Sequence, residues 1–523
     1  MRRFWSVGAP CGVRQLLIGL AAAGLFGTSP AAARFLPDSA EIGTPGDRKL
    51  VDEALSQLTV PGQATPAEAL ATLDRALTQL SEPSESRGII QFLRAGFLSE
   101  RDQDVAAREA IDESVRLLPG YSGPLLTAAT LYSYSDQPTL AADYLLRATE
   151  IDPEMTRRFE EYDLNNILQR LSVLTEARRI KMLSERLLAI GWRGQGLASQ
   201  SRLALNAIEA RVEEGDVAGA RGLIPKLLLP RHSRDLLMQS KFRELWPDLE
   251  RWAGSKLEKQ WSVYLREARD KWQASKDPAT ALDYAIALEE ANHNDTMIRE
   301  MLPLFSSLDP QDDYDLIFIA AKLAEALARK GRWDDIEKMF ESGARAWPLG
   351  GHANALNIAA NRARFAFYRG KAAEALAGID AAIADAARWR EQVNQGGLAG
   401  MHYYRACILH KLGRTEDAAL SRTIVAQVHG PASLAGLFLC LDKPETARQV
   451  LISALADEDK RAEVLGFVQK DSAPALRSDY GVWLDARFEE MRTDPQLLSK
   501  VAKYGRVLPF SLSEGAPLEA QVP

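Results

Sequence analysis

Apolar residues recur every three or four positions along most of this chain, which is the spacing of one buried face of an amphipathic helix. Proline and glycine fall mainly between these stretches. The sequence lacks runs that alternate apolar and polar residues between the turn sequences typical of β-hairpins. The pattern therefore predicts an all-α fold built from consecutive helices.

One set of positions returns after 34 residues. The small, large, small and proline positions of the two copies are Ala107, Ile111, Ser114 and Pro119, then Ala141, Leu145, Ala148 and Pro153. Small residues let two helices approach closely, and the large residue fills the space between successive units. The proline ends the second helix because it has no amide hydrogen. This spacing predicts a repeated helix–turn–helix unit.

The unit resembles the tetratricopeptide repeat (TPR), a helix–turn–helix motif of 34 residues. The match is best over 122–155, extends over 65–155 and 315–460, and is weak over 156–310. The resemblance implies a bacterial exported TPR-containing protein. It also implies a helical-repeat solenoid, in which antiparallel helix pairs stack in a right-handed superhelix of two blocks with a degenerate middle.

The phased repeats divide the chain into segments. We predict, in order, a signal peptide at 1–33, an N-terminal TPR-like block at 48–155, degenerate helical repeats at 156–310 with a tryptophan-rich joint near 241–272, a C-terminal TPR-like block at 311–460, capping helices at 461–510 and a disordered tail at 511–523. The joint holds Trp246, Trp252, Trp261 and Trp272. We interpret these as core packing, with an aromatic ligand patch as the alternative.

The N-terminus has the three parts of a secretory signal peptide. Arg2, Arg3 and Arg14 precede an apolar run at 16–26, and a small-residue site ends at Ala33. The run of 11 residues is shorter than the ~20 that a membrane-spanning helix needs. We expect cleavage near Ala33 and a periplasmic or secreted protein, with an uncleaved N-terminal anchor as the alternative.

The charge balance argues against two classes of partner. The chain has 64 basic and 71 acidic residues, and removing residues 1–33 moves its net charge from −7 to −10. Nucleic-acid binding requires a basic face that neutralises phosphates, and binding to an anionic lipid surface requires a polybasic patch. We therefore expect a protein or peptide partner, no nucleic acid, and no membrane contact after signal cleavage.

Two cysteines follow the predicted signal peptide, Cys407 and Cys440. Each lies among apolar residues of a predicted helix, and two cysteines do not make a disulfide framework. We expect buried free thiols, because a free cysteine packs like a small apolar residue. A disulfide is the alternative in an oxidising compartment.

No catalytic motif is present. The phosphate-binding G-x-x-x-x-G-K-[ST], the zinc-protease H-E-x-x-H and the hydrolase G-x-S-x-G are all missing. His402, Cys407 and His410 are close in sequence, but their spacing aligns only partly on one helical face. We predict no metal, no cofactor and no enzyme activity. An enzyme with an unrecognised site in 156–310 is the alternative.

The TPR resemblance implies that inner positions of the first helix of each pair line a concave surface that binds the partner. These positions are Thr130, Tyr134, Asn357, Arg364, Phe367, Tyr368, Tyr403, His410 and Lys411. The aromatic and basic residues of the C-terminal block fit an extended peptide or an acidic segment. The alternative is that they are ordinary packing and solvated charge.

These observations predict an exported scaffold that binds another protein or peptide, as an adaptor or assembly factor without catalysis. A component of envelope polysaccharide or cell-wall export machinery is the alternative. The sequence names neither the partner nor the oligomeric state.

Overall fold

The computed structural model describes residues 35–37, 42–58, 65–80, 83–194, 197–311, 313–389 and 393–518. The predicted signal peptide lies outside these residues. Within them every regular element is a helix, and one isolated bridge pairs Gln239 with Gly505. The all-α helical repeat is therefore confirmed. None of the described helices is both long enough and apolar enough to cross a lipid bilayer.

The chain divides between Leu227 and Leu228 into two compact units. We call the described residues up to Leu227 the first unit and those from Leu228 onward the second unit. This division lies before the tryptophan-rich stretch at 241–272, all of which belongs to the second unit.

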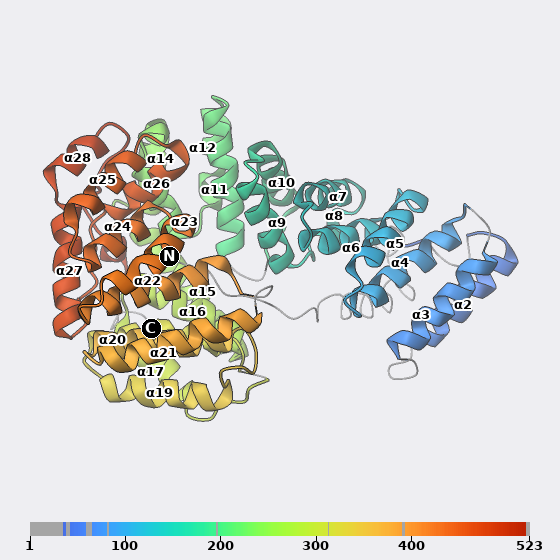
Figure 1. Cartoon of the computed structure of the whole chain (residues 1–523). Helices are drawn as coiled ribbons and strands as arrows, with labels where there is room; N and C mark the ends of the chain where they lie inside the picture. Colours follow the sequence, from blue (N-terminus) through green and yellow to red (C-terminus); the bar gives the residue numbers. More distant parts are fainter. Residues whose placement is uncertain are drawn as a thin grey trace. The chain divides into compact units, whose positions relative to one another are not determined.

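The first unit is a row of helix pairs (Figure 1). Its helices are α2 (Pro45–Leu58), α3 (Pro66–Gln79), α4 (Glu85–Ser99), α5 (Asp104–Leu117), α6 (Ser122–Ser133), α7 (Pro138–Ile151), α8 (Pro153–Thr156), α9 (Glu161–Val173), α10 (Ala177–Ile190), α11 (Leu197–Glu213), α12 (Val217–Leu223) and the 3-10 turn η2 (Ile224–Lys226). Prolines begin α7 and α8, where the missing amide hydrogen has no helical partner. The repeat residues Ala141, Leu145 and Ala148 are fully buried.

The second unit contains the remaining elements. They are α13 (Pro230–Leu237), η3 (Ser240–Leu245), α14 (Trp246–Ala253), α15 (Glu258–Ser275), α16 (Pro278–Glu290), α17 (Asn294–Met301), η4 (Leu302–Phe305), α18 (Leu316–Arg329), α19 (Trp333–Ala346), α20 (Ala355–Tyr368), α21 (Ala372–Ala386), η5 (Ala387–Trp389), α22 (Gln395–Lys411), η6 (Glu416–Ala418), α23 (Ala419–Val428), α24 (Pro431–Cys440), α25 (Pro444–Ala454), α26 (Glu458–Phe467), α27 (Asp479–Arg492), α28 (Pro495–Val501) and η7 (Leu512–Gly515).

Helices α16, α18, α20, α22 and α24 are the first helices of successive pairs, and each packs against the next. Three of the turns within the pairs contain Gly331, Gly370 and Gly413, each with a positive φ. Glycine adopts this left-handed conformation without the steric cost that a side chain would bring, so it ends one helix and lets the chain reverse.

The two ends of the second unit meet. Met238, just after α13, lies in a buried apolar cluster with residues of α24–α28. The amide of Arg506 donates to the carbonyl of Met238 at 2.9 Å, and the amide of Ser240 donates to the carbonyl of Tyr504 at 2.9 Å. The array of pairs is therefore closed by long-range contacts.

Residues 511–518 pack against the second unit and include the short helix η7, in contrast to the disordered tail predicted for 511–523. Residues 519–523 lie outside the described residues. The indole of Trp261, fully buried in α15, donates to the carbonyl of Leu512 at 2.8 Å. The guanidinium of Arg506 lies 3.8 Å from the ring centre of Trp246. Two of the four tryptophans thus hold the C-terminal segment in place, which sequence periodicity alone does not reveal.

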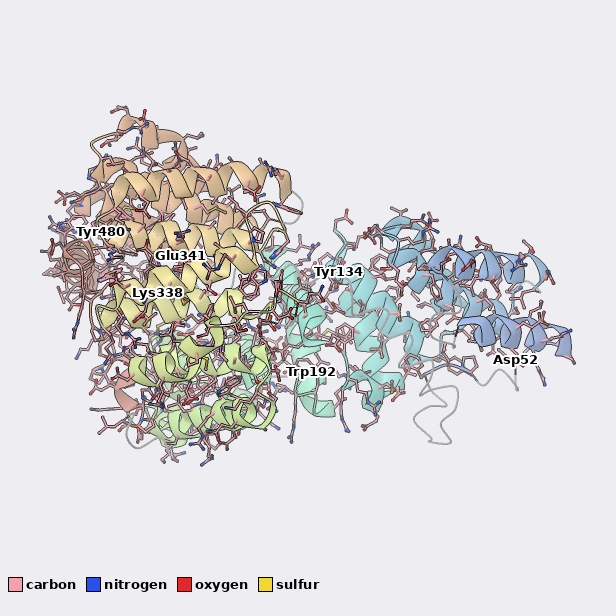
Figure 2. The ribbon with its side chains drawn as sticks, turned by 90° about the horizontal axis from the view of Figure 1, so that it is seen from below. Asp52, Tyr134, Trp192, Lys338, Glu341 and Tyr480 are labelled. Atoms are coloured by element: carbon pink, nitrogen blue, oxygen red, sulfur yellow. A yellow bond between two sulfur atoms is a disulfide. The ribbon has the colours of Figure 1, made fainter. Side chains whose placement is uncertain are left out.

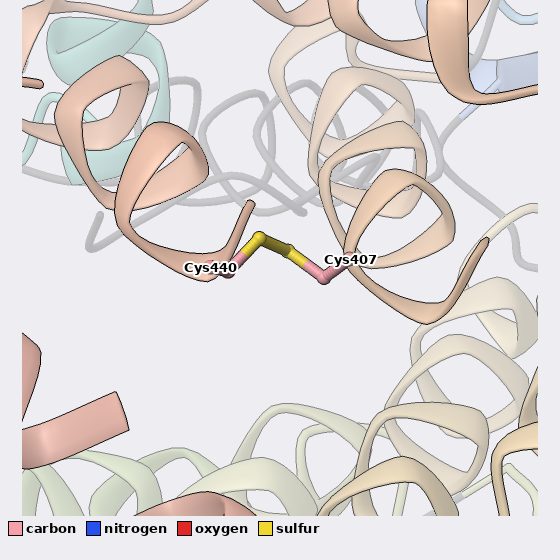
Figure 3. Close-up of a disulfide and its surroundings, with 2 residues drawn as sticks. All are labelled: Cys407 and Cys440. Carbon is pink, nitrogen blue, oxygen red and sulfur yellow. A yellow bond between two sulfur atoms is a disulfide. The ribbon is translucent and has the colours of Figure 1, made fainter. Parts of the chain in front are cut away.

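Cys407 and Cys440 form a disulfide between α22 and α24, with their Cα atoms 5.7 Å apart (Figure 3). The expectation of free thiols is therefore wrong. The cysteines are 33 residues apart, which is close to one repeat length. Equivalent positions of successive first helices face each other in a stack, so this separation brings the two sulfurs together.

Candidate partner-contact surfaces

The aromatic residues predicted to contact a partner in the second unit lie together but are buried. Helix α27 packs against α20 and α24. The ring of its Tyr480 lies 4.4 Å from Phe367 and 5.8 Å from Tyr368. Phe367, Tyr368 and Tyr403 are at most 9% exposed. This helix of the same chain therefore covers the face to which we had assigned the partner.

The segment before α27 is also fixed to the pair formed by α18 and α19. The amide of Arg477 donates to the carbonyl of Ala328 at 3.1 Å. The carbonyl of Arg477 accepts from the indole of Trp333 at 3.0 Å. Further along α27, Arg487 donates to Asp442 at 3.0 Å. These contacts hold α27 against the repeats along its length.

Arg364 links three consecutive first helices. Its Nη2 lies 2.6 Å from Oε1 of Glu325 on α18, and its guanidinium lies 5.4 Å from the ring centre of Tyr404 on α22. Burial raises the pKa of Glu325, but the charges of Arg364 and Arg329 outweigh it and lower that pKa to about 2. The carboxylate is thus held ionised inside the second unit, where it holds the helices together.

The other residues predicted in the second unit lie apart from these contacts. Asn357 is buried near the start of α20, and its carbonyl accepts from the side chain of Asn361 at 2.8 Å. His410 is half-buried near the end of α22, with Nδ1 3.3 Å from the hydroxyl of Thr415. Lys411 is exposed.

The first unit presents a different surface. The hydroxyls of Thr130 and Tyr134, at the end of α6, donate to the two oxygens of Asp163 on α9, at 2.8 and 2.7 Å. Asp163 is buried, and burial raises its pKa although both hydrogen bonds oppose that effect. The side chain of Asn166 donates to the carbonyl of Ser133 at 2.7 Å. These bonds fix α9 against α6.

Tyr134 and Tyr162 stack beside Asp163. Their ring centres are 6.3 Å apart and the rings are inclined by 27°. Tyr134 is 49% exposed and Tyr162 is 37% exposed, so the stacked pair lies at the surface (Figure 2 labels Tyr134). We had missed Tyr162 and Asp163 in the sequence. Asp163 comes 33 residues after Thr130, so the repeat period could have paired them.

The stacked tyrosines lie in acidic surroundings. Burial raises the pKa of Glu160, and the nearby carboxylates of Asp163 and Glu161 raise it further. Burial also raises the pKa of Tyr134, with Asp163 and Glu160 among its other causes. Such mutual shifts mark a locally negative surface.

Metal chemistry finds no support in the described part of the chain, where no three histidine, cysteine or acidic side chains are arranged to hold an ion. His402, considered above with Cys407 and His410, is buried with its Nδ1 3.1 Å from the hydroxyl of Ser421. Cys407 is in the disulfide.

No protein-family model and no curated protein matches the chain. Similar solved structures include "Structure of Naa15/Naa10 bound to HypK-THB", at 14% identity and a TM-score of 0.20, covering 90% of this chain and 78% of that one. Another is "Crystal Structure of P58(IPK) TPR Domain at 2.5 A", also at 14% identity and a TM-score of 0.20, covering 73% of this chain and 99% of that one. Likenesses this low carry no argument about function, so the repeat assignment rests on the helix pairs themselves.

Proposed function

We propose that this chain is an exported, non-catalytic helical-repeat scaffold that binds another protein or peptide as an adaptor or assembly factor. The observation that carries the proposal is the exposed stack of Tyr134 and Tyr162, which joins two successive helix pairs of the first unit. Large aromatic side chains are enriched at the centres of protein interfaces, where they bury much area at little entropic cost.

The contact surface belongs to the first unit in this proposal. The corresponding aromatic residues of the second unit, Phe367, Tyr368 and Tyr403, are buried, and α27 packs on Phe367 and Tyr368. A partner would have to displace a helix of the chain itself to reach them. Thr130 and Tyr134, by contrast, lie on a surface that none of the described helices covers: Tyr134 keeps half of its surface exposed.

Two observations support export to the periplasm or beyond. Residues 1–33 have the composition of a signal peptide. The disulfide between Cys407 and Cys440 suits an oxidising compartment, because cytosolic reductants keep most thiols reduced. The mass of the mature chain tests this part of the proposal: we expect it to begin at residue 34, and a chain that keeps Met1 would contradict signal cleavage.

Chemical crosslinking and affinity capture of the full-length protein from its native cells test the scaffold role. We compare the wild-type chain with a Tyr134→Ala, Tyr162→Ala double variant. The matched control is a Val173→Ala, Leu174→Ala double variant, which removes exposed apolar side chains elsewhere in the same unit. We expect a partner that the wild type and the control capture and the tyrosine variant loses. Failure of the wild type to enrich any protein would contradict the scaffold role.

A further inference from the structure

Helix α27 is held to the rest of the second unit in two different ways along its length. Its second half belongs to a buried apolar cluster, in which Met491 is 3% exposed and Phe488 packs against the other members. Its first half lies on α20, with the ring of Tyr480 4.4 Å from that of Phe367 (Figure 2 labels Tyr480). Detachment of the first half would therefore leave the apolar cluster intact.

The contact under the first half of α27 leaves polar groups unsatisfied. Among the described residues, the hydroxyl of Tyr480 and the Nε atom of Arg364 are buried and make no hydrogen bond. Burial raises the pKa of Tyr480, and the neighbouring Tyr368 and Tyr404 raise it further. A buried donor without a partner is less stable than the same donor in water. Hydration of these groups on opening therefore offsets part of the cost of exposing the aromatic rings.

The chain that leads into α27 is held at separate points. The hydroxyl of Ser472 is hydrogen-bonded to that of Ser511 at 2.7 Å, and residues 473–478 form no helix before α27 begins. Two hydrogen bonds of Arg477 join this stretch to α18 and α19. We call residues 473–484 the lid. A segment held in this way opens locally at a small part of the cost of global unfolding.

We propose that the lid is autoinhibitory: it covers a face of α20 that binds a helical segment of a partner protein, and the partner displaces it by placing an aromatic side chain where Tyr480 lies. The lid itself shows what this face accepts, because the ring of Tyr480 packs against both Phe367 and Tyr368. A helix that docks through such anchors is a common form of peptide recognition. The inference goes beyond the proposed function, since it adds a second contact surface that stays covered until a partner opens it.

A reducible crosslink tests whether the lid opens. A Cβ atom at Gly331, in the turn between α18 and α19, would lie 3.9 Å from the Cβ of Arg477 in the lid, which a disulfide can span. The Gly331→Cys, Arg477→Cys variant can thus be closed by oxidation and released by a mild reductant. Both positions are exposed, whereas Cys407 and Cys440 are at most 2% exposed, so the reductant reaches the new bond first. The reduced form is the matched control, because it carries the same substitutions.

The probe is a fluorescein-labelled peptide of residues 473–484, titrated with the full-length protein and followed by fluorescence anisotropy. We expect it to bind the reduced variant about tenfold or more tightly than the oxidised one, because the closed lid covers the face. A peptide with Tyr480→Ala should bind about tenfold more weakly than the unchanged peptide. In the protein, Tyr480→Ala weakens the lid and should tighten binding of the unchanged peptide, whereas Val482→Ala, at a side chain that is 57% exposed, should not.

Two results would overturn the inference: equal affinity of the peptide for the oxidised and the reduced variant, or no binding to a Tyr480→Ala protein whose circular dichroism matches the wild type. Hydrogen exchange provides a measurement without the peptide. Oxidation of the crosslinked variant should slow amide exchange at 483 and 484 and leave 489–491 unchanged, and equal exchange at 483 and 484 in both forms would also contradict a lid. None of these results depends on Tyr134 or Tyr162, so the lid can fail while the first unit's contact surface stands.

Discussion

Replacing Glu325 by glutamine tests whether the partly buried ion pairs of Glu325 hold the second unit together. Glu325 accepts from Arg364 at 2.6 Å and from Arg329 at 3.4 Å. Its pKa of about 2, against the ordinary 4.5, corresponds to about 3 kcal/mol of folding free energy, since each pKa unit is worth ~1.36 kcal/mol. In the variant at neutral pH, Arg364 and Arg329 also lose their carboxylate partner. We therefore expect Glu325→Gln to lower the free energy of unfolding by about 3 kcal/mol or more.

The stabilisation by Glu325 should decrease as the pH falls. A carboxylate whose pKa is lowered on folding stabilises the protein above its unfolded pKa and loses that effect as the pH falls toward the folded value. The contribution of Glu325 to the free energy of unfolding of the wild type should thus be complete above pH 4.5. By pH 3 the wild type should have lost about 2 kcal/mol of this stabilisation. The difference in free energy of unfolding between the wild type and the Glu325→Gln variant should therefore narrow by about 2 kcal/mol.

Urea unfolding followed by tryptophan fluorescence measures this effect. Eight of the ten tryptophans follow Leu228, so the signal reports mainly on the second unit. Glu341→Gln on α19 is the matched control, since Glu341 pairs with Arg362 at the surface at 3.8 Å. We expect that control to change stability by less than about 1 kcal/mol. If the difference in free energy of unfolding between the wild type and Glu325→Gln stays constant from pH 6 to pH 3, the electrostatic argument is refuted.

Three further variants test the closure of the second unit and its disulfide. Gly505→Ala would force a Cβ against the carbonyl oxygen of Met238, so we expect the free energy of unfolding in urea to fall by about 1–3 kcal/mol; a variant as stable as wild type would contradict the closure. Replacing both Cys407 and Cys440 by alanine should cost about 3–4 kcal/mol for a closed loop of 33 residues, and equal stability of the wild type with and without reductant would count against the bond. Trp261→Phe removes the hydrogen bond to the carbonyl of Leu512, so amide exchange at 511–518 should speed up, and unchanged exchange would show that this contact does not hold the segment.

The helix pairs could be predicted because their signals are local. The glycines at 331, 370 and 413 lie in turns within the pairs, and the small residues Ala141 and Ala148 are buried between helices, as the repeat pattern indicated. Each of these features depends on a residue and its neighbours within one repeat, where helical period and turn chemistry act directly.

The candidate site could be predicted only in part. Thr130 and Tyr134 were found by their position in the repeat, but Asp163, which accepts from both, and Tyr162, which stacks on Tyr134, come from the next pair. In the second unit the same positional reasoning selected Phe367, which α27 covers. Repeat position identifies the face that a residue occupies, and it does not show whether another segment lies on that face.

The sequence by itself determined that this protein is all-α, that it is built from repeated helix pairs, and that repeat residues such as Ala141, Leu145 and Ala148 pack inside a pair. Only the tertiary structure decided that the two ends of the second unit meet, that α27 covers its first helices, and that Cys407 reaches Cys440. The physical reason is the separation along the chain between the residues that interact. Helix formation and pairing follow from side chains a few positions apart, whereas closure depends on apolar surfaces such as that of Met238 finding partners more than 190 residues away along the chain.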